Sequence, residues 1–293
     1  LQKGGDIALR SGNGAVSTGV ISIMSSNLDG SNGGSGDLLL GSGKASGDGR
    51  SGAIKIQSGD TDNENVGDVL IEGGSSSGAA SGDGGTILLK SGKSESKKAG
   101  MVVLQSGTGG EFGSSSGNIV LESGVSPTGN SGSILLETGG ATGGDGGDVQ
   151  ILVGDGDLGN GGDVAISAGT TWSIGDEGGI VAVYGGEGDS GGDLIFQGGE
   201  GKGLLTSEHG GSVQLKGGQS TSGRGGLAVF SSGGSDIGPS GLTIIKTESS
   251  ESASGKTIIT TGNILGEGQG SDDIRSGDIE IATGNANSGT SGN

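Results

Sequence analysis

The sequence predicts an all-β fold of the β-solenoid, or parallel β-helix-like, class, and three observations lead to it. Gly accounts for 76 of the 293 residues and aromatic residues for only 2%, so any core must be thin and aliphatic. A unit of the form G-x-[ILV]-x-[ILVF]-x-x-G recurs along the whole chain. Its apolar residues alternate with a period of two, which is typical of short β-strands. Stacking such strands at the usual spacing of ~4.8 Å would bury a continuous aliphatic stripe.

Eighteen units can be recognised, and each is named here by its leading glycine. The first and last leading glycines are 272 residues apart over seventeen intervals, a mean of sixteen residues per unit. A second glycine follows seven residues after the leading one in all units but two, where Ser26 and Glu248 stand instead. Connecting segments such as KASGDGRS and GATGGDG consist mostly of turn formers. The leading glycines are Gly5, Gly19, Gly36, Gly52, Gly67, Gly85, Gly100, Gly117, Gly132, Gly147, Gly162, Gly179, Gly192, Gly211, Gly226, Gly241, Gly255 and Gly277.

The third position after the leading glycine favours two units per coil, forming two facing parallel sheets. This position should point outward, and it is apolar in all nine odd-numbered units but polar in five of the nine even-numbered ones. The odd units therefore predict an apolar outer face through which the protein assembles. We take as this assembly face Leu39, Leu70, Val103, Leu135 and Ile195.

The repeat runs through residues 1–293, so we expect a single continuous array. It is still in force at both ends, in LQKGGDIAL and in GDIEIATGNANSGTSGN, which favours a segment of a longer protein or filament. The formal net charge of -19 opposes binding to nucleic acid or to anionic membrane surfaces. No apolar run approaches the ~20 residues of a membrane span, so we expect no span. The chain has no Cys and therefore no disulfide or thiolate metal site.

Several short motifs resemble catalytic or cofactor sites but lack the required context. Residues 154–159 match G-x-G-x-x-G, yet a strand pattern follows where a dinucleotide site needs a helix. Ser76 and Ser115 each stand in G-x-S-x-G, a pattern that needs a following helix and a His base. The only His is His209. We expect no enzyme activity, no catalytic residues and no bound cofactor.

Asp often follows the leading glycine, and in the two-unit coil Asp6, Asp37 and Asp68 would stack along one edge, about 5 Å apart. Two interpretations remain open. Each carboxylate accepts N–H groups of its own turn, or a Ca²⁺ ion bridges the carboxylates. The turn interpretation is preferred, because Asp is a common turn former.

Units such as GNGGDVAISAG and GEGDSGGDLIFQGG resemble the Gly/Ser-rich repeat regions of large predicted extracellular or cell-surface proteins of eukaryotic microalgae. The resemblance implies an extracellular or cell-surface location and a structural role. We therefore expect a structural subunit of an extracellular filament or cell-surface fibre, whose partner is a further copy or a continuation of the same chain. O-linked sugars on loop Ser and Thr are a further expected partner. The alternatives are an adhesin stalk, or an ice-binding or Ca-binding module.

Overall fold

The structure is a computed structural model, and it describes residues 5–14, 17–27, 34–62, 65–77, 82–110, 113–203, 209–263 and 276–284. Throughout these ranges the backbone contains no helix and no β-strand. The chain divides into two compact units, Leu1–Gln150 and Ile151–Asn293. The boundary between them falls inside the repeat that starts at Gly147. Half of the two predicted open ends, residues 1–4 and 285–293, lies outside the described ranges.

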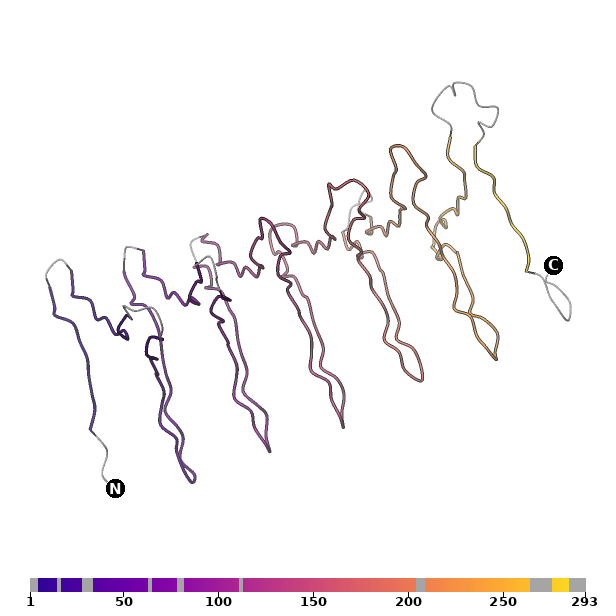
Figure 1. Ribbon diagram of the computed structural model, residues 1–293. Helices are drawn as coiled ribbons and strands as arrows, with labels where there is room; N and C mark the ends of the chain where they lie inside the picture. Colours follow the sequence, from indigo (N-terminus) through magenta and orange to yellow (C-terminus); the bar gives the residue numbers. More distant parts are fainter. Residues whose placement is uncertain are drawn as a thin grey trace. The chain divides into compact units, whose positions relative to one another are not determined.

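The predicted β-solenoid, with two units per coil and two facing sheets, is wrong for the described residues. The repeat instead forms extended segments joined by loops, as Figure 1 shows. A β-ladder needs successive hydrogen bonds between neighbouring backbones. The described residues contain only nine backbone hydrogen bonds. Each is a single bond that joins the two ends of one loop, and we call this place the neck of the loop. Without ladders the segments form no sheet, and no stacked coils cover the aliphatic side chains.

The nine neck bonds follow the sequence repeat closely. In every case the second glycine of one unit accepts a hydrogen bond from the N–H of the leading glycine of the next unit. Each bond thus closes the loop between two apolar segments, in the manner of an Ω-loop. The N···O distances range from 2.7 to 3.3 Å. The donor and acceptor pairs are Gly19–Gly12, Gly85–Gly74, Gly100–Gly92, Gly117–Gly107, Gly179–Gly169, Gly192–Gly186, Gly211–Gly199, Gly226–Gly218 and Gly241–Gly233.

The two glycines of a neck have different steric requirements. A Cβ atom on the donor Gly85 would lie 2.8 Å from the backbone nitrogen of Gly74, a distance that real Cβ atoms essentially never show. A Cβ atom on the acceptor Gly74 would meet nothing within 4 Å. At this neck a side chain is excluded at the donor and not at the acceptor. The donors Gly19 and Gly241 would have nearest Cβ contacts of 3.5 and 3.4 Å, which are ordinary van der Waals distances, so the exclusion varies from neck to neck.

Four of the loops share a further feature, a serine that organises the turn inside the loop. Each spans nine residues and has Ser at its third position, whose Oγ accepts the N–H of the residue three further along. The N···O distances of these bonds are 2.9 to 3.1 Å. The loops are 92–100, 124–132, 218–226 and 233–241, with Ser94, Ser126, Ser220 and Ser235.

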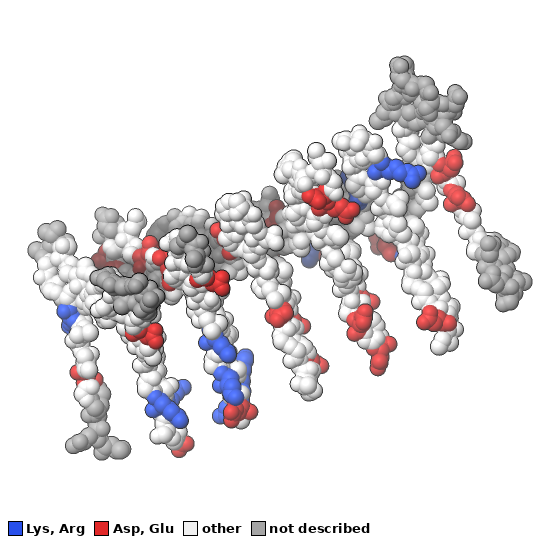
Figure 2. Space-filling view, viewed as in Figure 1, with Lys and Arg blue, Asp and Glu red and all other residues white. Residues whose placement is uncertain are grey.

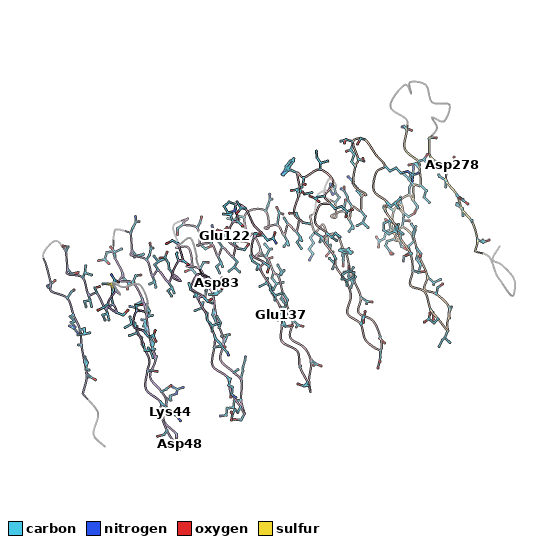
Figure 3. All side chains as sticks on the ribbon, in the orientation of Figure 1. Lys44, Asp48, Asp83, Glu122, Glu137 and Asp278 are labelled. Atoms are coloured by element: carbon cyan, nitrogen blue, oxygen red, sulfur yellow. The ribbon has the colours of Figure 1, made fainter. Side chains whose placement is uncertain are left out.

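The extended segments retain the alternation that the sequence predicts. Successive side chains project to opposite sides of an extended backbone, and Figure 3 shows side chains on both sides of these segments. The third position is the more exposed one: Leu39 is 84% exposed against 55% for Leu38. Ile195 is 77% exposed against 49% for Leu194. The outward direction of the third position is thus a local property of the segment and does not require a sheet.

Candidate functional site

The candidate site of this protein is its exposed apolar surface. Among the described residues no hydrophobic side chain is buried, and the aliphatic side chains of every extended segment are open to solvent. The five residues predicted as an assembly face are all exposed, by 62% to 84%. So many exposed aliphatic side chains are unusual on a soluble monomer, which makes them candidates for contact with another surface. The residues are Leu39, Leu70, Val103, Leu135 and Ile195.

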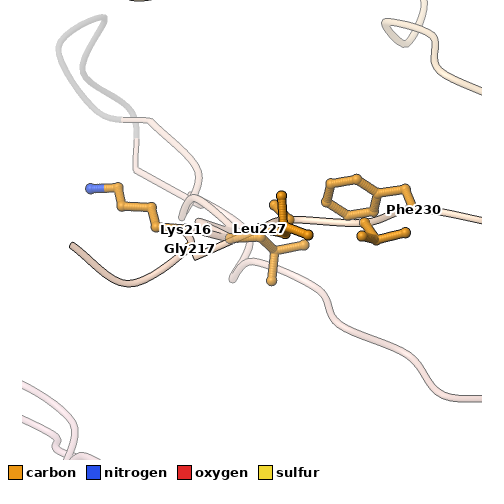
Figure 4. Close-up of a pocket in the computed structure, with 7 residues that line it drawn as sticks. Lys216, Gly217, Leu227 and Phe230 are labelled. Carbon is orange, nitrogen blue, oxygen red and sulfur yellow. The ribbon is translucent and has the colours of Figure 1, made fainter. Parts of the chain in front are cut away.

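A shallow pocket lies where two extended segments leave the neck of loop 218–226. Its volume is about 240 Å³, and Lys216, Leu227 and Phe230 line it together with Gly217 (Figure 4). The neck bond, with 2.8 Å from the nitrogen of Gly226 to the oxygen of Gly218, lies between these two segments in the sequence. The lining leucine and phenylalanine side chains are largely exposed. The pocket is therefore a widened part of the exposed apolar surface rather than a separate enclosed cavity.

Ser76, Ser115, His209 and residues 154–159 lie within the described ranges, whereas Gly78 of the first G-x-S-x-G motif lies outside them. His209 Nδ1 lies 3.4 Å from the carbonyl oxygen of its neighbour Gly210. Neither Ser76 nor Ser115 is followed by a helix within the described residues. In the same residues no helix follows the 154–159 motif. That the protein has no enzyme activity remains a prediction.

The three aspartates of the predicted edge do not form a metal-binding group. Within the described ranges, no cluster of three or more His, Cys, Asp or Glu residues is arranged to hold a metal ion. The 5 Å spacing expected for Asp6, Asp37 and Asp68 required stacked coils, which are not found. The carboxylates of these residues accept no hydrogen bond from a described backbone N–H, whereas serine hydroxyls do so in four loops. The turn-forming role that we assigned to Asp is therefore performed by Ser in those loops.

The turn-forming role of these serines was not predicted from the sequence. No role was predicted for the positions of the charged residues along the chain either. The spacing G-x-S-x-x-x-x-x-G, with glycines at both ends of a nine-residue connection, was the sequence signal that could have identified the serines. The uneven distribution of Lys and Arg along the chain was the signal for the charged residues. The described ion pairs are Lys93–Glu95 at 3.4 Å, Lys202–Glu200 at 3.7 Å and Lys246–Glu248 at 3.0 Å. All of these side chains are exposed, so the pairs contribute little to stability.

No helix among the described residues is long and apolar enough to cross a membrane. In comparisons with protein families, curated proteins and solved structures, no match to the chain was found.

Proposed function

We propose that this chain is a structural repeat protein of an extracellular filament or cell-surface fibre, and that it assembles with further copies of itself. The observation that supports this proposal is the regular series of exposed aliphatic segments. Eighteen units place such segments along 293 residues, and no described hydrophobic side chain is buried. Burying one large aliphatic side chain is worth about 1.5–3 kcal/mol, so even partial covering of this series would stabilise an assembly strongly.

The arrangement of the loops is compatible with this role. Each neck holds the ends of two successive apolar segments together, through one hydrogen bond between glycines. The segments that leave the neck keep free backbone N–H and C=O groups along their length, because the described residues contain no ladder hydrogen bonds. Unpaired extended backbone of this kind readily pairs with another extended chain. A second copy can therefore supply both an apolar cover and hydrogen-bond partners.

Two further considerations support the extracellular or cell-surface location. The Gly/Ser-rich units resemble repeat regions of large surface proteins, as described above. The loops expose many Ser and Thr hydroxyls, which O-linked sugars would use as attachment points.

The test is a pair of substitutions at the exposed third position. Leu70→Lys with Leu135→Lys places two charges on the assembly face, and we expect it to dissociate the assembly. Gln57→Lys with Gln105→Lys adds the same two charges at polar positions of extended segments, and we expect it to leave the assembly intact. Sedimentation over a range of protein concentrations, with electron micrographs of the sedimented material, measures the effect. A wild-type chain that remains monomeric at every concentration would overturn the proposal.

A further inference from the structure

The positively charged residues are distributed unevenly along the chain. Residues 90–98 contain four Lys and one Glu. The next 103 residues, 99–201, contain fourteen Asp and Glu and neither Lys nor Arg. A short cationic segment is thus followed directly by a long anionic one, in a chain whose net charge is -19.

The loop 92–100 concentrates the positive charge. Its ends are joined by the neck bond, with 2.8 Å from the nitrogen of Gly100 to the oxygen of Gly92. Inside the loop the N–H of Lys97 donates to Ser94 Oγ over 3.1 Å. Lys93, Lys97 and Lys98 are therefore held in one closed loop of nine residues. Glu95 pairs with Lys93 at 3.4 Å, which leaves the loop, here called the basic loop, with a formal charge of +2.

The segment 99–201 carries some of its carboxylates on the connections between apolar segments. The loop 186–192 carries Glu187 and Asp189, and its neck is closed over 2.9 Å by Gly192 and Gly186. The connection 154–162 carries Asp155 and Asp157. All these residues are exposed. Figure 2 shows Lys and Arg in the first part of the chain, with acidic residues beside them, and again towards its C-terminal end. We call 154–162 and 186–192 the acidic loops.

We infer that the basic loop of one copy binds an acidic loop of a second copy, so that neighbouring copies are staggered along the fibre. This inference rests on the proposed self-association and adds the surface that directs it. Two copies packed in register would place residues 99–201 of one against the same acidic residues of the other, and like charges so placed repel. A stagger instead brings opposite charges together.

The geometry of such a contact also suits a fibre. The basic loop and the acidic loops are different surfaces of the same chain, so the contact is heterologous. A heterologous contact leaves one unused partner surface on each copy, and it continues into an open filament when the rotation between copies does not close a ring. The charge distribution thus favours polymers over closed dimers.

The first test reverses the charge of the basic loop. In the variant Lys93→Glu, Lys97→Glu and Lys98→Glu, we expect the concentration for half-assembly to rise at least tenfold. The control variant Lys216→Glu, Arg224→Glu and Lys256→Glu changes the net charge by the same amount at cations outside the basic loop. We expect its half-assembly concentration to rise less than threefold. Sedimentation at low ionic strength measures both variants.

The second test restores the contact by mixing. An acid-reversed variant, Asp155→Lys, Asp157→Lys, Glu187→Lys and Asp189→Lys, should also assemble poorly alone, because its basic loop then faces Lys. An equimolar mixture with the basic-reversed variant should assemble again, since each variant supplies the charge that the other lacks. Rescue in the mixture is not expected if the substitutions merely damage the fold.

The outcomes separate this inference from the proposed function. If the wild-type and basic-reversed chains assemble equally, the staggered charge contact is wrong and self-association stands. If the wild-type chain does not assemble at all, both proposals are wrong. If the chain stays monomeric but binds dextran sulfate through the basic loop, the partner is a polyanion and the inference is overturned. Reversal effects that are independent of protein concentration indicate a contact within one chain and also overturn it.

Discussion

The loops 92–100 and 233–241 have the same local construction and very different charge. Each spans nine residues, and their neck bonds have N···O distances of 2.8 and 2.9 Å. In each, the serine at the third position accepts an N–H three residues further along, over 3.1 Å at Ser94 and 2.9 Å at Ser235. The first loop carries three Lys and one Glu, whereas the second carries Asp236 as its only charged residue.

The comparison shows that loops with the same neck glycines and the same serine bond can differ widely in charge at their other positions. Because those other side chains are exposed, their charge has little influence on the loop itself. The charged side chains of the loops are therefore available for interactions with other surfaces. Glycines and serines shape the connections, aliphatic residues provide apolar surface, and charged residues vary from loop to loop.

The largest difference between the two loops is expected when the donor glycine of the neck is replaced by alanine. A Cβ on Gly100 would lie 3.1 Å from the nitrogen of Gly92, whereas a Cβ on Gly241 has 3.4 Å to its nearest atom, Ser232 Cβ. Gly100→Ala should therefore weaken its neck more than Gly241→Ala. Losing a hydrogen bond worth about 1 kcal/mol speeds exchange of the residue 100 amide hydrogen about fivefold.

The control for that prediction uses the acceptor glycines of the same two necks. A Cβ on Gly92 or Gly233 would meet nothing within 4 Å, so Gly92→Ala and Gly233→Ala should leave amide exchange at the necks nearly unchanged. Hydrogen exchange followed by NMR compares all four variants directly. Equal acceleration by the donor and acceptor substitutions would show that the necks do not depend on this close approach.

An intermediate effect is expected from salt, which acts on the charges and leaves the shared loop construction alone. The Debye length falls from ~30 Å at 0.01 M salt to ~8 Å at 0.15 M, so contacts between exposed charges weaken. We expect the half-assembly concentration of the wild-type chain to rise about threefold over this range. The basic-reversed variant should respond much less. Because salt also screens the general repulsion between chains of net charge -19, the decisive result is the difference between the two chains: equal salt responses would contradict a contact between opposite charges.

Part of this organisation could be predicted from the sequence. The repeat identified both glycines of each neck, and at donors such as Gly85 the close backbone approach excludes other residues. It also identified the outward third position, because alternation along an extended chain is set by local geometry. The predicted assembly face, from Leu39 to Ile195, is exposed like all other described hydrophobic side chains, and its role in assembly stays a prediction.

The partners of the extended segments could not be predicted in the same way. A period of two specifies which side chains share a face of a segment, but it does not specify which backbone will lie beside that segment. The β-solenoid prediction supplied such a neighbour by stacking units, and the described residues contain no ladder that would support it. The expected Asp edge depends on the same stacking, since Asp6, Asp37 and Asp68 would meet only through it.

The smallest effect concerns the serine inside each loop. Ser94→Ala and Ser235→Ala remove the Oγ that accepts the N–H of Lys97 and of Gly238, respectively. Both bonds are exposed, and water replaces much of what is lost, so a cost of about 0.5 kcal/mol is expected. Amide exchange at residues 97 and 238 should then be about twofold faster in each variant, despite the different charges of the two loops. Ser94→Thr and Ser235→Thr keep a hydroxyl and should restore the wild-type rates. If only the charged loop responded, the shared construction would be incorrect, because the serine of loop 92–100 would then act through its lysines rather than through the backbone.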